Sequence, residues 1–132
     1  MEPSPADERE TAYDLLQRGE ELLHLRHHAQ AAIVLERANR LEPHRQSILE
    51  ALGRAYFNSG QPELSRRTFS ELLELDPSAH YAHYALGQSL KRLGRRDEAR
   101  THLKLAVALS PRTPLYRQAL ARIPNPEPDT GN

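Results

Sequence analysis

The chain has 132 residues, of which 38% are hydrophobic and 27% charged, and its 18 basic and 18 acidic residues give a formal net charge of zero. This length fits one domain, and the low hydrophobic content is typical of an elongated fold with a thin core. The sequence contains no cysteine, which excludes disulfides, thiol catalysis and thiolate zinc sites.

The first residues are rich in proline and polar side chains, as in Glu2-Pro3-Ser4-Pro5, so we expect residues 1–7 to be disordered. They do not resemble a signal peptide, which combines a basic start with an apolar stretch. Apolar runs throughout the chain are also far shorter than a membrane span. These features predict a cytoplasmic protein without a membrane contact.

From residue 12 onward, apolar residues recur at three- and four-residue spacing, which predicts amphipathic helices. The helices are predicted to come in pairs that are separated by short turns. In the turn of the second pair, Gly60 can adopt the left-handed conformation that ends a helix, and Pro62 suits the first turn of the next. Gly94 repeats this pattern in the third pair. The first pair has Arg26 instead, so we expect that turn to be strained or differently shaped.

The pattern has a period of 34 residues, which is typical of stacked helical repeats. Two series of residues follow this period. The glycines are Gly19, Gly53 and Gly87, and the prolines are Pro43, Pro77 and Pro111.

This spacing resembles the tetratricopeptide repeat (TPR), with the prolines at repeat position 32 and the glycines at the small position 8. Position 20, also small in the family, holds Ala31, Ser65 and Ala99. Two departures are mild: no tryptophan occupies position 4, and Leu72 replaces a small residue at position 27. The resemblance implies an all-α, right-handed superhelical solenoid over residues 8–123, with repeats at 12–45, 46–79 and 80–113 and a capping helix at 113–123. We expect residues 124–132 to form a second disordered tail.

The resemblance also implies a concave surface, lined by the first helix of each repeat, that holds another protein. Tyrosine offers a large apolar face at a low cost in side-chain entropy, although some of these rings could simply pack between helices. We therefore predict a non-catalytic scaffold or adaptor that binds a peptide or helix in this groove. The candidate groove residues are Tyr13, Leu16, Glu20, Glu50, Arg54, Phe57, Tyr81, Tyr84 and Gln88.

Family members that hold the acidic tails of heat-shock chaperones use lysine, arginine and asparagine side chains as a carboxylate clamp. None of the corresponding positions of this chain carries such a residue, and Glu20 would repel a carboxylate. The sequence therefore predicts no chaperone-tail clamp. The five positions hold Leu16, Glu20, Ala51, Tyr81 and Ala85.

Charge is distributed unevenly, with net charges of −4 over residues 1–44, −1 over 45–78 and +5 over 79–132. Such a dipole favours head-to-tail association, so we expect a monomer or a weak, salt-sensitive oligomer, with structural self-assembly as the alternative function. A binder of acidic protein or nucleic acid is a further alternative, although the basic segment lacks interleaved aromatic residues and nucleic acid is disfavoured. Its basic residues are Lys91, Arg92, Arg95, Arg96, Arg100 and Lys104.

Catalysis, metals and cofactors have little support in the sequence. His24, His27 and His28 straddle a predicted turn, and His80 and His83 supply two nitrogens with no acid at ligand spacing. There is no glycine-rich phosphate loop and no recognisable catalytic triad. Glu50 and Arg54 are explained by an ion pair across one helical turn. We therefore expect no enzyme activity, no metal and no cofactor.

Overall fold

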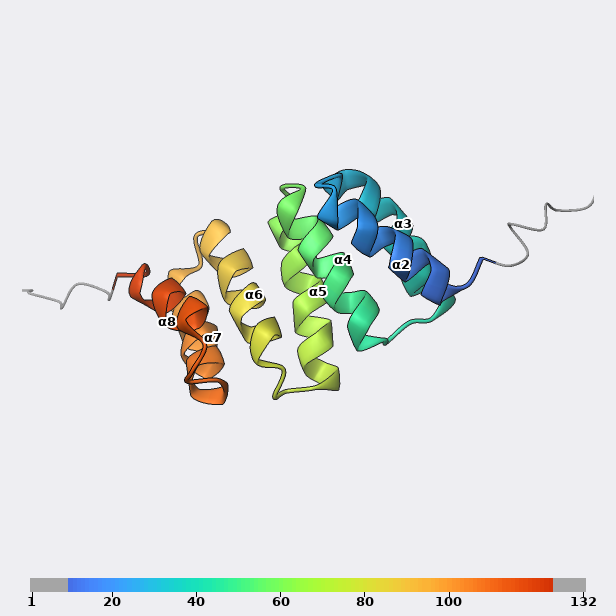
Figure 1. Ribbon diagram of the computed structural model, residues 1–132. Helices are drawn as coiled ribbons and strands as arrows, with labels where there is room; N and C mark the ends of the chain where they lie inside the picture. The colour runs from blue at the N-terminus through green and yellow to red at the C-terminus, as the bar shows by residue number, and fades with distance from the viewer. Residues whose placement is uncertain (1–9, 125–132) are drawn as a thin grey trace, which may run out of the picture.

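The structure, a computed structural model, describes residues 10–124 (Figure 1). These residues form helices only, as predicted. The helices are α2 (Ala12–His24), α3 (His28–Leu41), α4 (Gln46–Asn58), α5 (Pro62–Leu75), α6 (His80–Arg92), α7 (Arg96–Leu109) and α8 (Pro114–Ala121). No helix in the described range is long and apolar enough to cross a membrane.

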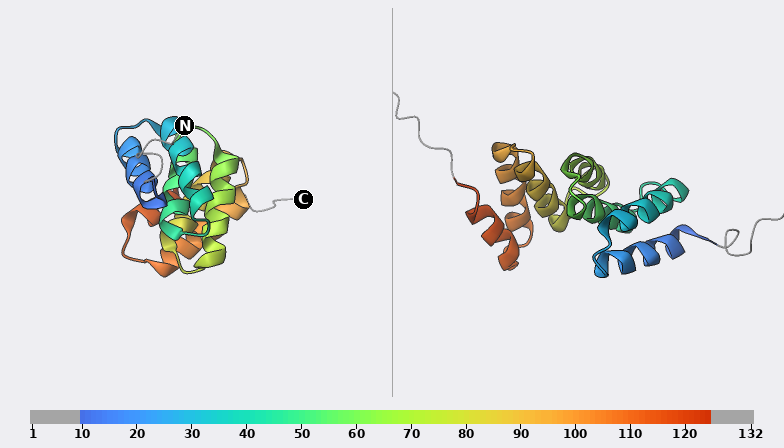
Figure 2. Two further views of the ribbon diagram at one scale, coloured as in Figure 1. Left: turned by 90° about the vertical axis from the view of Figure 1, so that its right-hand side faces the viewer. Right: turned by 90° about the horizontal axis from the view of Figure 1, so that it is seen from above.

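The helices pack in pairs, α2 with α3, α4 with α5 and α6 with α7, and each pair stacks on the next. Figure 1 shows the pairs following one another along the molecule, so that residues 10 and 124 lie at opposite ends of the array. The two rotated views show the same arrangement (Figure 2). Each predicted repeat, 12–45, 46–79 and 80–113, contains one of these pairs.

Local sequence signals define several helix ends. Thr11 and Asp14 form a capping box at the start of α2, in which each side chain accepts a hydrogen bond from the other's backbone N–H at 3.1 Å. Pro62 and Pro114 begin α5 and α8, where the missing proline N–H would have had no helical partner. Pro43, Pro77 and Pro111 lie in the turns after α3, α5 and α7.

The turns within the three pairs share one shape. Gly60 and Gly94 have φ angles of +80° and +78°, and Arg26 has a φ of +65°. After each of them comes a backbone N–H that bonds to a carbonyl five residues earlier, as from His27 to Leu22 at 2.8 Å. The turn at Arg26 is thus strained, because arginine adopts a backbone region that favours glycine, but it is not differently shaped. A second residue of this kind, His44 with a φ of +67°, was not predicted.

The period-34 glycines lie where the two helices of a pair cross. A Cβ atom on Gly19 would lie 2.5 Å from Leu35 Cγ, and one on Gly53 would lie 2.6 Å from the ring of Phe69. At Gly87 the corresponding distance to Leu103 Cγ is 2.8 Å. The neighbouring side chains are completely buried, so any larger residue forces the helices apart.

The core consists of three hydrophobic clusters that follow one another along the stacked helices. Its largest fully buried side chains are Phe69, Leu15, Leu35, Leu49, Leu90 and Leu103. One polar contact crosses it: Ser89 Oγ, on α6, lies 2.9 Å from Ser65 Oγ, on α5, which in turn donates to the Gly53 carbonyl at 3.0 Å. These buried hydroxyls link the second repeat to the third.

The capping helix α8 is slightly shorter than the predicted segment 113–123. It buries Tyr116 and Ala119, and Ile123 is buried just after the helix ends. The predicted disordered tails, 1–7 and 124–132, lie outside the described residues except for Pro124.

Candidate functional site

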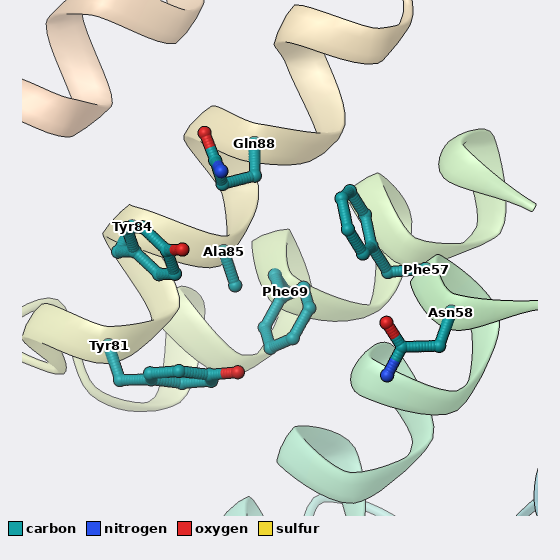
Figure 3. Close-up of a pocket in the computed structure, with 7 residues that line it drawn as sticks. All are labelled: Phe57, Asn58, Phe69, Tyr81, Tyr84, Ala85 and Gln88. Atoms are coloured by element: carbon teal, nitrogen blue, oxygen red, sulfur yellow. The ribbon is translucent and has the colours of Figure 1, made fainter. Parts of the chain in front are cut away.

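A pocket of about 170 Å³ opens between α4 and α6. Figure 3 shows Phe57 and Tyr84 on opposite sides of it, with Ala85 and Phe69 between them. Phe69 belongs to α5 and forms the floor. The lining residues are Phe57, Asn58, Phe69, Tyr81, Tyr84, Ala85 and Gln88.

One side of the pocket is a row of aromatic rings that continues to the capping helix. The Phe69 and Tyr81 rings meet edge to face with centres 6.2 Å apart, and Tyr81 and Tyr84 follow at 5.9 Å. Tyr84 then packs on Tyr116 at 5.2 Å, and the Tyr116 hydroxyl lies 2.8 Å from His80 Nδ1. Each ring restricts the next, so the pocket wall is formed before any ligand arrives.

Burial raises the pKa of Tyr81 to about 12, and it raises the pKa of Tyr116 as well. Both phenols therefore keep their proton at neutral pH. They present an apolar ring with a hydroxyl that can donate or accept a hydrogen bond.

The structure divides the nine predicted groove residues into three groups: four that line the pocket, three on α2, and the pair Glu50 and Arg54 on α4. Phe57, Tyr81, Tyr84 and Gln88 line the pocket. The three predicted residues of α2 do not: the Tyr13 side chain is 67% exposed, Leu16 packs against the core of the first repeat, and Glu20 is exposed.

The predicted ion pair between Glu50 and Arg54 is wrong, since no contact within 4.0 Å joins them among the described ion pairs. Both charges lie near Tyr81 instead. The Arg54 guanidinium lowers the pKa of that phenol and the Glu50 carboxylate raises it, although burial has the largest effect. They are therefore part of the pocket's surroundings.

The positive charge of the basic segment around residues 91–104 is partly neutralised. Arg95 pairs with Glu98 at 2.9 Å, and Arg100 is 9% exposed and pairs with Asp97 at 3.2 Å. Arg92 points elsewhere: its guanidinium carbon lies 4.2 Å from the centre of the Phe57 ring, at the edge of the pocket.

Phe69 and Tyr116 were not among the predicted groove residues. Both lie outside the first helices of the repeats, from which the groove residues were predicted, and their contacts with Tyr81 and Tyr84 depend on side-chain packing between helices. Position 13 of the repeat indicates that Arg92 lies on the concave side. The stacking of its guanidinium on Phe57 could not be predicted, because it depends on the side-chain rotamer.

The histidines form one close pair. His83 and His102 stack with Nδ1 atoms 3.1 Å apart, and His83 Nε2 lies 2.9 Å from the Pro77 carbonyl oxygen. Burial, and secondly His83, lower the pKa of His102. Within residues 10–124, no cluster of three or more acidic or histidine side chains could hold a metal ion.

Comparison with known proteins supports the repeat assignment. The tetratricopeptide repeat family matches residues 50–114. The mouse Superkiller complex protein 3 is 31% identical over 96 residues, which are 71% of this chain but only 6% of the mouse protein.

Two solved structures share the fold. The first TPR domain of Spaghetti (RPAP3), bound to the HSP90 peptide SRMEEVD, has a TM-score of 0.81 at 17% identity, and the match covers 86% of this chain and 90% of that one. The Yersinia enterocolitica secretion chaperone SycD, in complex with a peptide of the translocator YopD, has a TM-score of 0.73 at 19% identity, over 84% and 85% of the two chains.

The stacked helix pairs and the glycine crossings define an all-α helical-repeat protein. More specifically, the chain is a tetratricopeptide repeat protein, whose seven described helices correspond to three repeats and a capping helix. Domains of this class are in general modules for protein and peptide interaction.

Proposed function

We propose that this protein is a non-catalytic adaptor that binds a segment of a partner protein in the groove between α4 and α6. The observation that carries this proposal is the pocket, in which aromatic side chains from two neighbouring first helices surround a preformed cavity. Tyrosine is among the side chains that most often dominate the energetics of a protein interface, and aromatic residues in general are enriched at interface cores.

The peptide complexes of the similar structures support a groove ligand without identifying it. The Spaghetti domain is bound to an HSP90 peptide, and SycD is bound to a YopD peptide. This chain has none of the clamp side chains that hold a chaperone tail: Ala51 and Ala85 are buried, and Glu20 is exposed and acidic. We therefore infer a ligand other than an HSP90 tail.

A test is affinity capture from an extract of the source cells, with the protein as bait and mass spectrometry as the readout. We expect the Tyr81→Ala, Tyr84→Ala double variant to lose about thirtyfold in affinity for the captured partner, since truncating a central aromatic costs about 2 kcal/mol or more. Because both rings pack on the core, a thermal melt must accompany this variant.

Phe57→Ala is a second test of the same pocket, because its partly exposed ring forms the opposite wall. Tyr13→Ala is the matched control, since Tyr13 is a tyrosine on the first helix of a repeat that does not line the pocket. Loss of the partner with Tyr13→Ala but not with Phe57→Ala would disprove the proposed site.

Structural self-assembly is the second candidate. Two large apolar side chains are exposed near opposite ends of the array, Tyr13 on α2 and Leu115 on α8, and the charge gradient favours head-to-tail contacts. We expect light scattering to show a monomer, or an oligomer that dissociates as salt rises, because the electrostatic reach falls to about 8 Å near 0.15 M salt. A salt-resistant oligomer would require an apolar interface.

A further inference from the structure

The positively charged guanidinium of Arg92, at the edge of the pocket, is held in place but lacks an acidic partner. The Arg92 guanidinium stacks on Phe57, and its Nη1 donates to the Phe57 carbonyl oxygen at 3.4 Å. None of the ion pairs in residues 10–124 involves Arg92. A guanidinium has five N–H donors in a planar fork, so most of them face solvent beside the pocket.

Several other arginines of residues 10–124 are paired with acidic side chains, although Arg92 is not alone in lacking such a partner. Arg66 pairs with Glu63 at 2.5 Å, and Arg95 pairs with Glu98. Arg54, on α4, also lacks an acid within ion-pair distance, and its charge lowers the pKa of Tyr81, although burial is the main influence on that phenol. Two arginines without an acidic partner, Arg54 and Arg92, thus lie on the two helices that form the pocket, α4 and α6.

The cavity has the size of one large apolar side chain. Its volume is about 170 Å³, and an apolar cavity of about 150 Å³ is large enough to bind benzene. A leucine, methionine or phenylalanine side chain therefore fits between Phe57 and Tyr84, above the Phe69 ring (Figure 3).

The side-chain amide of Gln88, at the rim of the pocket, is a third feature that bears on the kind of ligand. Gln88 Oε1 is buried at the pocket and has no hydrogen-bond partner in the described chain. A buried acceptor without a donor costs free energy, which a ligand N–H can recover once the Gln88 side chain rotates toward the pocket. Extended peptides offer free backbone N–H groups, whereas those in the interior of a helix are already bonded.

We propose that the groove takes an extended acidic peptide segment, which inserts one large apolar side chain into the pocket and pairs a nearby aspartate or glutamate with Arg92. This inference rests on the proposed function and specifies its ligand. The carboxylate must lie within about two residues of the apolar anchor, because an extended chain advances roughly 3.3 Å per residue and Phe57 borders both sites. An internal segment suffices, since no contact to a chain terminus is needed.

The test begins with a displayed library of random dodecapeptides, selected on the immobilised full chain and counter-selected on Phe57→Ala. We expect the enriched peptides to combine a large apolar residue with aspartate or glutamate one or two positions away. The best peptide is then synthesised with a fluorescent label, and its affinity is measured by anisotropy at about 0.15 M salt.

Three protein variants separate the contribution of the stacked Arg92 guanidinium to peptide affinity from the contribution of its positive charge. Arg92→Ala is expected to weaken binding about tenfold or more, as a charge-assisted hydrogen bond is lost. Arg92→Lys should weaken it nearly as much, because lysine keeps the charge but not the stacked fork. Arg96→Ala removes an exposed arginine at the start of α7 and should change the affinity less than about twofold.

A double-mutant cycle supplies the decisive result. Replacing the peptide carboxylate with an amide should weaken binding to the wild type about tenfold and should have little further effect on Arg92→Ala. Additive losses, equal effects of Arg92→Ala and Arg96→Ala, or enriched peptides without acidic residues would overturn this inference and leave the groove as a binding site.

Two further outcomes are distinguishable. If no peptide depends on Phe57, the proposed function fails together with the inference. If the protein dimerises in sedimentation experiments and both Phe57→Ala and Arg92→Ala abolish the dimer, the occupant is a second copy of the chain, and the peptide proposal is overturned.

Discussion

The first helices of the first and third repeats occupy equivalent places in the array but present different surfaces. Tyr13 of α2 makes no ring contact within the described chain and is largely exposed, whereas Tyr81 and Tyr84 of α6 belong to a packed row of rings. The row exists because α5 supplies Phe69 and α8 supplies Tyr116. A tyrosine at a groove position therefore forms a pocket only where the neighbouring helices provide aromatic partners.

The largest expected effect comes from filling the helix crossing at Gly53, because the Phe69 ring that forms the floor of the pocket packs there. Gly53→Leu places a branched side chain against the Phe69 ring, where even a Cβ atom would lie 2.6 Å away. We expect it to lower the free energy of unfolding by about 3 kcal/mol or more, and to destroy the pocket with it. Chemical denaturation measures the first effect, and peptide binding the second.

Gly60→Ala is the control for this experiment. Nothing lies within 4 Å of a Cβ atom at Gly60, but its φ of +80° disfavours alanine. We expect a loss of about 1 kcal/mol, with the pocket intact. Equal losses at the two glycines would contradict the helix-crossing role of Gly53.

A smaller effect should appear on acidification, and it should be confined to the third repeat. The pKa of His102 is lowered from 6.5 by burial and by His83. As the pH falls below about 6.5, the unfolded chain binds a proton on this histidine more readily than the folded one, so the free energy of unfolding decreases. Above that pH the ring is neutral in both states and contributes no pH dependence.

Amide hydrogen exchange at several pH values can localise this effect. We expect α6 and α7 to lose protection in mild acid before α2 and α3, since stability in a repeat array is partly local. His102→Gln should flatten the pH dependence. Uniform loss of protection along the chain would mean that other groups control acid stability.

The smallest effect concerns the turn of the first repeat. Arg26→Gly should raise the free energy of unfolding by roughly 0.5 kcal/mol, because relief of the left-handed arginine backbone slightly exceeds the entropy that glycine adds to the unfolded chain. The reciprocal change, Gly94→Arg, should be destabilising. If Arg26→Gly lowered the stability in denaturation experiments, the exposed Arg26 side chain would have a role that the structure does not reveal.

The repeat spacing predicted the helix pairs because each signal is local in sequence or tied to the 34-residue period. Glycine at a crossing and proline after a second helix can be recognised without knowing any side-chain conformation. Gln88 and Tyr84 were likewise placed in the groove by position alone. The strain at His44 was not predicted, because no glycine marks that turn.

Contacts between side chains of different helices were harder to predict. The stacking of Arg92 on Phe57 and the pairing of His83 with His102 join residues 35 and 19 positions apart. The predicted Glu50 and Arg54 pair failed for a related reason: helical spacing permits such a contact, but both side chains instead lie near Tyr81 on the neighbouring helix.

The buried hydroxyls of Ser65 and Ser89 have a consequence for the mechanics of the array. The Ser89 hydroxyl lies 2.9 Å from both Ser65 Oγ and the Ala85 carbonyl oxygen, so bending the joint between the second and third repeats would remove one of its two partners inside the core. In the described chain, the joint between the first and second repeats combines apolar packing with contacts nearer the surface, His44 with Glu71 at 3.5 Å and Glu36 beside the Tyr56 hydroxyl. We therefore expect the second joint to resist bending more than the first, and the pocket between α4 and α6 to keep its width when the first repeat moves.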